Sequence, residues 1–280
     1  MAQPRVIVLR APGTNCDEET AHAFSLAGSL PEIWHVNRVL EQPARLADFQ
    51  ILCIPGGFSY GDDIAAGRIL GNQIQHHLAD ALREFHAAGK LILGICNGFQ
   101  VLLKTNLLTK ADDRGPTATL APNDSGHFEA RWVRVEVKDA NCVFLEGIEE
   151  MELPVAHAEG KFVVRDERTF TKLDQAGQLV LRYAEGVGAA AIGQQKNEPP
   201  SPGGDWSGHA LEPAVPYPHN PNGAMGDVAG MCDPTGRVFG LMPHPERFVD
   251  PTQHPAWTRL PAGQAADGLR VFQNAVRYFR

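Results

Sequence analysis

Residues 90–103 read Lys90-Leu-Ile-Leu-Gly-Ile-Cys-Asn-Gly-Phe-Gln-Val-Leu-Leu103, and this stretch decides the fold. The apolar run at 91–95 predicts a strand buried on both faces, and the apolar run after Gly98 predicts a helix. Gly94 and Gly98 stand two residues before and two residues after Cys96, where glycines relieve crowding in a sharp strand-to-helix turn. We therefore expect Cys96 at the tip of this turn, with a strained backbone and its sulfur exposed above a sheet.

The expected place of Cys96 also predicts its chemistry. Unpaired N–H groups and the dipole at a helix N-terminus favour the thiolate, which is the reactive form of cysteine. The alternative is a buried core cysteine beside a glycine-rich bend, and the spacing G-x-C-x-G alone leaves both possibilities open. The rest of the chain must decide between them.

The fold follows from further apolar runs that resemble the one before Cys96. Short runs rich in branched residues at 6–9, 32–36 and 51–54 predict additional buried strands. The segment 63–88 between them predicts a helix, because it repeats apolar residues at steps of four and is followed by Gly89 as a helix end. Alternating strands and helices indicate an α/β fold with a doubly wound, mainly parallel sheet flanked by helices.

The second half of the chain has a different pattern. Period-two runs at 131–137, 162–164 and 179–181 predict strands with no helix between them, and therefore an antiparallel extension at the edge of the sheet. A further strand at 237–242 and a closing helix from about residue 265 complete the prediction. We expect the 280 residues to form a single domain, with proline-rich insertions near 194–217 and 250–263.

Composition excludes several classes of protein. With 25 Lys and Arg against 33 Asp and Glu, the net charge of −8 disfavours a nucleic-acid partner. No apolar run approaches the length of a signal peptide or a membrane span, so we expect a soluble, cytoplasmic protein without a membrane partner. The five cysteines have neither the spacing of a disulfide framework nor that of a zinc site, so we expect no metal.

A cysteine that attacks an amide needs a base, and histidine is the usual one near neutral pH. Of the eleven histidines, His244 has the most unusual setting, because it lies between two prolines just after a predicted strand. Glu246 follows two residues later and projects to the same side, where a carboxylate can orient the imidazole. A proline-rich loop with a surface histidine is the alternative if Cys96 is not reactive.

A third element follows the strand at 51–54. Gly56 and Gly57 stand at the carboxyl end of that strand, where glycine backbones expose N–H groups that can hold a developing oxyanion. The N–H of Asn97 can complete such an oxyanion hole. A plain tight turn is the alternative for Pro55-Gly-Gly57 taken alone.

Together these motifs resemble the class I, or triad, glutamine amidotransferases, which release ammonia from glutamine. Five strings resemble more narrowly the glutaminase subunits of phosphoribosylformylglycinamidine synthase: Pro12-Gly-Thr-Asn-Cys-Asp17, Pro55-Gly-Gly-Phe-Ser-Tyr-Gly-Asp62, Gly94-Ile-Cys-Asn-Gly-Phe-Gln100, Asn220-Pro-Asn-Gly223 and Met242-Pro-His-Pro-Glu-Arg247. The resemblance spans most of the chain. It implies Cys96 as nucleophile, His244 as base and acid, and Glu246 as the group that orients it. It further implies oxyanion donors at the backbone of three residues and a glutamine-binding side chain: Gly56, Gly57, Asn97 and Gln100.

The resemblance also implies partners. The chain has no G-x-x-x-x-G-K-[ST] motif, so no cofactor is expected in it, and ATP and Mg²⁺ are expected on a separate synthetase subunit (PurL-like). A small third subunit (PurS-like) often accompanies that pair in purine (IMP) biosynthesis. Alternative interpretations are another class I amidotransferase, an acyl hydrolase with the same triad, or a redox-sensing cysteine module. The redox module would have no need of His244 and Glu246.

Overall fold

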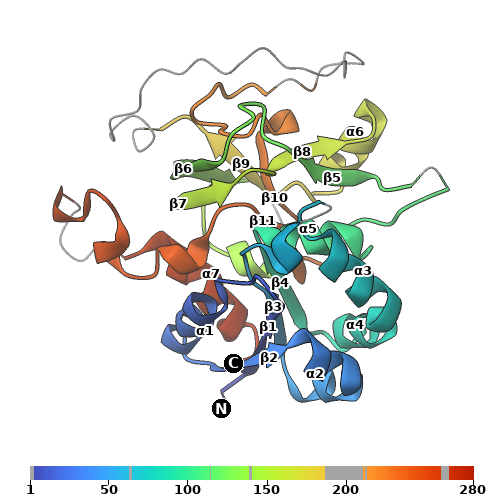
Figure 1. Ribbon diagram of the computed structural model, residues 1–280. Helices are drawn as coiled ribbons and strands as arrows, with labels where there is room; N and C mark the ends of the chain where they lie inside the picture. The colour runs from blue at the N-terminus through green and yellow to red at the C-terminus, as the bar shows by residue number, and fades with distance from the viewer. Residues whose placement is uncertain are drawn as a thin grey trace.

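The computed structural model describes residues 3–62, 65–113, 115–138, 141–186, 211, 213–259 and 265–280 (Figure 1). Its larger sheet consists of β1 (Arg5–Arg10), β2 (Leu30–His35), β3 (Ile51–Ile54), β4 (Leu91–Ile95), β6 (Glu129–Val137), β7 (Glu150–His157), β9 (Leu181–Ala184), β10 (Val228–Cys232) and β11 (Val238–Leu241). The spatial order of these nine strands is β2-β1-β3-β4-β11-β10-β9-β6-β7. The last strand of the nine in sequence therefore lies in the middle of the sheet.

The first half of this sheet is parallel. Neighbouring strands from β2 to β11 all run in the same direction, and every residue of β3, β4 and β11 is buried. Figure 1 shows two helices on one side of these strands, α1 (Asp17–Leu26) and α7 (Asp267–Arg277), and three on the other, α3 (Arg68–His77), α4 (Ala79–Ala87) and α5 (Asn97–Lys104). The short α2 (Val36–Glu41) follows β2. The predicted α/β fold with a mainly parallel sheet is confirmed.

The second half is antiparallel, as the period-two runs predicted. β10, β9, β6 and β7 pair in antiparallel fashion, and β5 (Ala118–Ala121) pairs with β8 (Lys161–Val164) in a separate small sheet. The expectation of no helix in this part is wrong, because α6 (Glu167–Gln175) lies between β8 and β9. Its start is stabilised by Asp166, whose carboxylate accepts a hydrogen bond from the N–H of Thr169 at 2.8 Å. Only Phe170 and Leu173 are buried, so its apolar stripe is too short to recognise.

The single helix expected over 63–88 is also wrong, because two helices occupy the segment. The chain leaves helical geometry at Leu78, with φ of −120° and ψ of 1°, between α3 and α4. The apolar stripe nevertheless continues across the break, since Leu78 is itself buried between Ile74 and Leu82. Gly89 ends α4 with φ of +80°, as predicted.

The proline-rich insertions are described only in part. Residues 187–210 and 212, which include most of the first, and residues 260–263 of the second lie outside the described residues. The described 3-10 turns are η1 (Pro43–Asp48), η2 (Ser59–Asp62), η3 (Val143–Leu145), η5 (Met225–Asp227), η6 (Pro245–Arg247), η7 (Pro251–Gln253) and η8 (Trp257–Arg259). None of the helices in the described part of the chain combines the length and the apolar character that crossing a membrane requires.

The arrangement of the parallel strands determines where chemistry can take place. β3, β4 and β11 lie in parallel, with β4 between the other two, so their carboxyl ends meet at one edge of the sheet. The loops that follow them are residues 55–62, the turn at Cys96 and residues 242–247. The three motifs singled out in the sequence therefore converge on one place.

Candidate active site

The turn at Cys96 has the strained backbone that its glycines predicted. Cys96 has φ of +50° and ψ of −105°, and its N–H donates to the carbonyl of Leu241 at 2.8 Å. A Cβ atom on Gly98 would lie 1.8 Å from the carbonyl oxygen of Ile54, and one on Gly94 would lie 2.6 Å from that of Gly98. Both glycines are therefore required for α5 to begin directly against β3 and β4.

The sulfur, however, is not exposed as predicted. Cys96 is only 5% exposed, and its Sγ lies 3.8 Å from the carbonyl oxygen of Ala156. Ala156 belongs to β7, at the far end of the sheet order from the parallel strands. The sequence could not indicate this contact, because it depends on how the antiparallel half folds back over the turn.

His244 and Glu246 form a fully buried pair beside Cys96. His244 is 1% exposed, its Nδ1 lies 2.6 Å from Oε1 of Glu246, and its backbone N–H donates to the carbonyl of Pro154 at 2.8 Å. Burial lowers the pKa of His244, but the Glu246 carboxylate and the side chains of Cys96 and Cys16 together raise it well above its ordinary value. Among the described residues Nε2 has no hydrogen-bond partner, so it is free to exchange a proton with a substrate. The structure thus brings all three predicted triad residues together.

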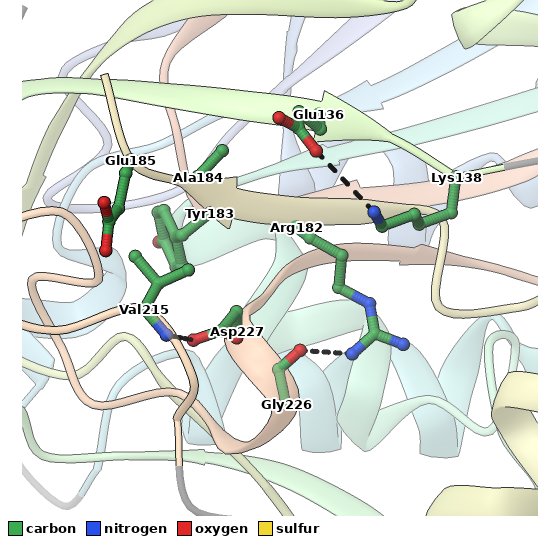
Figure 2. Close-up of a pocket in the computed structure, with 9 residues that line it drawn as sticks. All are labelled: Glu136, Lys138, Arg182, Tyr183, Ala184, Glu185, Val215, Gly226 and Asp227. Atoms are coloured by element: carbon green, nitrogen blue, oxygen red, sulfur yellow. Dashed lines mark hydrogen bonds and ion pairs between the residues drawn. The ribbon is translucent and has the colours of Figure 1, made fainter. Parts of the chain in front are cut away.

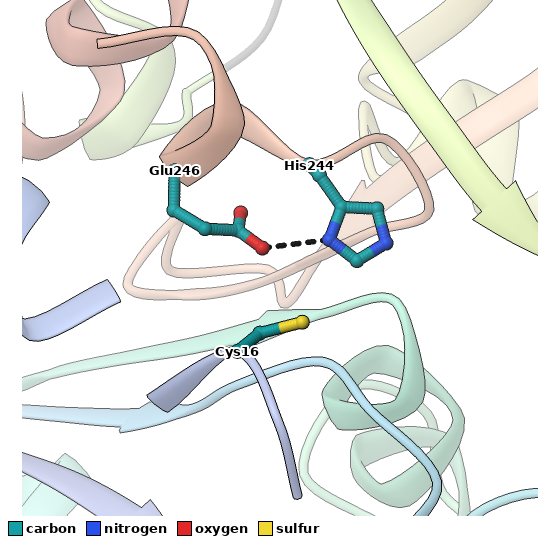
Figure 3. A group of neighbouring side chains, drawn as sticks. All are labelled: Cys16, His244 and Glu246. Atoms are coloured by element: carbon teal, nitrogen blue, oxygen red, sulfur yellow. Dashed lines mark hydrogen bonds and ion pairs between the residues drawn. The ribbon is translucent and has the colours of Figure 1, made fainter. Parts of the chain in front are cut away.

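A second thiol, Cys16, lies against the same pair (Figure 3). Gly56 makes room for it, because a Cβ on Gly56 would lie 2.8 Å from Cε1 of His244 and 3.2 Å from Sγ of Cys16. Arg247 donates to this sulfur at 3.2 Å, yet burial raises the pKa of Cys16 to about 11. Cys16 therefore remains a thiol, and it interacts with the imidazole of His244.

Cys16, His244 and Glu246 also offer the kinds of atoms that bind zinc, and these atoms lie within 4.8 Å of one another. Two ligands on one tetrahedral zinc ion are about 3.3 Å apart or more, since each bond is about 2.0 Å long. The 2.6 Å between Nδ1 and Oε1 is shorter than this and is the length of a charge-assisted hydrogen bond. The pair therefore has the geometry of a hydrogen bond and not that of two ligands on one zinc ion.

The loop after β3 contains Gly56 and Gly57, two of the three residues predicted as oxyanion donors. Gly57 has φ of +126°, and a Cβ there would lie 2.7 Å from the backbone nitrogen of Asn15. The loop is tied to the segment before α1, since Phe58 N–H donates to the Gly13 carbonyl at 3.0 Å. Within the part of the chain that the structure describes, the N–H groups of Gly57 and Asn97 have no acceptor, so both can serve a ligand.

Gln100, expected to bind glutamine, is tied into the protein itself. Its Oε1 accepts from Asn97 at 2.9 Å, and its Nε2 donates to the carbonyl of Glu159 at 2.6 Å. Asn97 also donates to Asp62 at 3.1 Å, and burial raises the pKa of that carboxyl. Asp62 was part of a recognised string but received no role from the sequence, because only the folded chain shows that its carboxylate faces the first turn of α5.

A separate hollow of about 290 Å³ lies at the antiparallel edge of the sheet (Figure 2). Its polar groups largely pair with one another: Val215 N–H donates to Asp227 at 3.1 Å, and Lys138 lies 3.6 Å from Glu136. The predicted site residues are not in its lining, which consists of Glu136, Lys138, Arg182, Tyr183, Ala184, Glu185, Val215, Gly226 and Asp227.

Comparison with known proteins gives consistent results. Residues 3–205 and 204–279 match the family model of the CobB/CobQ-like glutamine amidotransferase domain. The phosphoribosylformylglycinamidine synthase subunit PurQ of Dehalococcoides mccartyi is 44% identical over 281 residues, which cover 100% of this chain and 99% of that protein. The PurQ subunit of Methanococcus maripaludis is 40% identical, with coverage of 99% and 97%.

Solved structures agree with the sequence comparison. A chain in the structure of PurLQS from Thermotoga maritima superposes with a TM-score of 0.70 at 28% identity, and each chain is covered completely. A glutamine amidotransferase from Thermotoga maritima gives a TM-score of 0.53 at 14% identity, with 100% of this chain and 98% of that one covered. At that identity the second likeness concerns the fold alone.

Proposed function

Because this chain belongs to the PurQ family of phosphoribosylformylglycinamidine synthase subunits, which are glutamine amidotransferases, we propose that it hydrolyses glutamine through Cys96, His244 and Glu246. The ammonia passes to an ATP-dependent synthetase subunit in purine biosynthesis. One observation carries the proposal: a strained cysteine at a helix N-terminus lies beside a buried histidine that a carboxylate holds at 2.6 Å. A redox-sensing cysteine has no use for that histidine–glutamate pair.

The reaction follows from the positions of these groups. The Cys96 thiolate attacks the carboxamide carbon of glutamine, and the N–H groups of Gly57 and Asn97 hold the oxyanion that forms. When the C–N bond breaks, the His244 imidazolium gives its proton to the departing nitrogen, and ammonia leaves. His244 then takes a proton from water as the water attacks the thioester. The C–S bond breaks, which restores the Cys96 thiolate beside the His244 imidazolium, and glutamate leaves as its new carboxyl group loses its proton to solvent. Glu246 fixes the tautomer and stabilises the imidazolium.

Glutamine hydrolysis needs no ATP. ATP and Mg²⁺ therefore bind to the partner subunit, and this chain itself needs no cofactor. The partner is a PurL-like synthetase, the third member is a small PurS-like protein, and the location is the cytoplasm. The structure of PurLQS from Thermotoga maritima supports an assembly of this kind. Direct transfer has a chemical reason, since ammonia that escapes into water at neutral pH is protonated and no longer nucleophilic.

The test uses the assembled complex with Cys96→Ala. Glutamine-dependent synthesis should be abolished, while synthesis from added ammonia should stay near the parent rate, because only the hydrolytic nucleophile is removed. Glutamate release measured in parallel separates a glutaminase from an acyl hydrolase of other specificity. Equal loss of both syntheses would contradict the division of labour between the two subunits.

A further inference from the structure

Next to Ala156, whose carbonyl contacts Cys96, stands a histidine that the mechanism does not use. His157 ends β7 and is 3% exposed. Gly160 leaves the space that its ring occupies, because a Cβ on Gly160 would lie only 2.4 Å from Cε1 of that ring. Ala156, the preceding residue, supplies the carbonyl that contacts Sγ of Cys96. His157 therefore follows directly on a residue that contacts the reacting sulfur.

The neighbouring Asn123 determines which ring nitrogen of His157 carries the hydrogen. Nδ2 of Asn123 donates to the carbonyls of His127 at 2.9 Å and His157 at 2.8 Å, which fixes its Oδ1 as an acceptor. Oδ1 accepts from the N–H of Gly160 at 3.1 Å and lies 3.1 Å from Nδ1 of His157. Nδ1 must therefore be the donor of this pair, and Nε2 carries a lone pair and no hydrogen.

That lone pair has no partner. Nε2 of His157 is buried, and no donor within the described residues reaches it. Burial lowers the pKa of His157 to about 3, and the charge of nearby His244 lowers it as well. The ring therefore stays neutral at physiological pH and offers a hydrogen-bond acceptor that cannot become a donor. A buried acceptor without a donor is costly, so a ligand that brings an N–H or O–H is favoured there.

The surroundings indicate which part of a ligand meets this acceptor. The carbonyl oxygen of the reacting amide turns toward Gly57 and Asn97, since their N–H groups are the free donors. A lone pair on His157 would repel that oxygen. The departing nitrogen must lie next to His244, which protonates it, and His157 is close enough to His244 to be influenced by its charge.

We propose that Nε2 of His157 accepts a hydrogen bond from the carboxamide nitrogen of glutamine, and so makes the site select glutamine over its product glutamate. The inference rests on the proposed glutaminase function and deepens it. The carboxamide offers an N–H to Nε2, whereas the carboxylate of glutamate offers only lone pairs. His157 gives and takes no proton, because His244 alone delivers the one that the leaving nitrogen requires. Sites built on a specific hydrogen bond strongly reject analogues that lack the donor.

Two substitutions separate this role from a structural one. In His157→Asn the amide nitrogen replaces Nδ1 and keeps the bond to Asn123, but the acceptor at Nε2 is lost. In His157→Gln the amide oxygen can reach the place of Nε2, while the bond to Asn123 is lost. In the assembled complex, the ratio of the glutamate inhibition constant to the KM for glutamine should fall about tenfold in His157→Asn. It should stay near the parent value in His157→Gln.

An unchanged ratio in an active His157→Asn complex, or an equal fall in both variants, would overturn the inference. Should His157→Asn fail to fold, His157→Gln decides: a ratio near the parent value supports the role, and a fall of about tenfold overturns it. Glutamate release by the parent complex is measured first. Its absence would refute the proposed function itself, so the two failures are distinguishable.

Discussion

At the scale of single residues, His244 has the largest role in the proposed mechanism, because it both gives and takes the proton. We expect His244→Ala to lower glutamate release by about 10² to 10⁴-fold, the usual contribution of a general acid and base. Glu246→Ala should cost less, since the imidazole remains and loses only its hydrogen bond to Oε1. Steady-state glutaminase assays of both variants check the order.

The nearby Arg247→Lys provides a matched control for these two substitutions. Arg247 lies next in sequence, and its side chain donates hydrogen bonds to Cys16 and Glu19. Its backbone N–H, which Lys keeps, donates to the carbonyl of His244. Its glutaminase rate should stay closest to that of the parent. A His244→Ala protein with the parent rate would remove this histidine from the mechanism.

His157 predicts a pH dependence of stability. Its pKa is about 3 in the folded chain and about 6.5 in an unfolded one, so between these values only the unfolded state binds the proton. The free energy of unfolding should therefore fall by about 1.4 kcal/mol per pH unit below pH 6.5 because of this residue. His157→Asn should make the acid decline shallower by one proton, as measured by urea unfolding between pH 6.5 and pH 4.

The same measurement on His77→Asn serves as the comparison. His77 is exposed on α3, so its replacement should leave the pH dependence of the parent in place. If His157→Asn and the parent lose stability in parallel as the pH falls, His157 is not held neutral in the folded protein.

At the scale of elements, the contact between α5 and β3 sets the position of the nucleophile. Gly98→Ala places a methyl group where the Ile54 carbonyl lies 1.8 Å away, so α5 must move. We expect a loss of about 1 to 3 kcal/mol in the free energy of unfolding. A displacement of about 1 Å at Cys96 should also lower glutamate release by about 10²-fold.

Gly147→Ala is the matched control for that substitution. Gly147 has φ of +69° and open space around it, so the methyl group costs about 1 to 2 kcal/mol through its left-handed backbone alone. Its glutaminase rate should remain that of the parent. Similar stability losses with unequal activities, measured by denaturation and glutamate release, would identify the α5 contact as the cause.

The strands of the parallel half could be predicted from the sequence, because a strand buried on both faces is a continuous run of apolar residues. β3 and β4 begin and end where the apolar runs at 51–54 and 91–95 do. β7 was not recognised, because Pro154 interrupts its alternating pattern. The structure explains the proline, since β7 is an edge strand and needs no N–H on its outer side. α6 could not be predicted either, because only Phe170 and Leu173 are buried and they do not form a recognisable apolar stripe.

The same difference between the two halves of the sheet decides which parts of the candidate site could be predicted. Cys96, His244 and Glu246 follow parallel strands whose ends must meet, so local sequence sufficed to bring them together. Burial of the sulfur and the acceptor on His157 depend on β7 and on Asn123, which lies in the loop before β6. Contacts between distant segments of the antiparallel half leave no periodic signal in the sequence.

At the scale of the whole molecule, the loop after β3 that contains Gly57 reaches the outer surface. Phe58, next to Gly57, is 44% exposed and packs at 6.4 Å between ring centroids against Phe128, which is 50% exposed. We expect a synthetase subunit that covers these rings to hold the Gly57 N–H in the orientation that the oxyanion needs. We expect the isolated chain to be a poor glutaminase, with the complex faster by about 10² to 10³-fold, the contribution of one oxyanion donor.

Glutamate release is measured before and after addition of the synthetase subunit with its nucleotide and substrate. Phe58→Ala should reduce the activation by the partner while leaving the rate of the isolated chain unchanged. An isolated chain that already works at the rate of the complex would contradict this form of control.

The central place of β11 has a consequence for the order of synthesis. β4 leads into Cys96, but its neighbour β11, on which His244 and Glu246 follow, is made much later in the chain. A ribosome that has just added Cys96 must still add residues 97–241 before the sheet can close, which takes about 7 to 30 s at ~5 to 20 residues per second. During that interval the nascent chain has a thiol without its base. Under the proposed mechanism, translation itself therefore delays ammonia release until nearly the whole polypeptide exists.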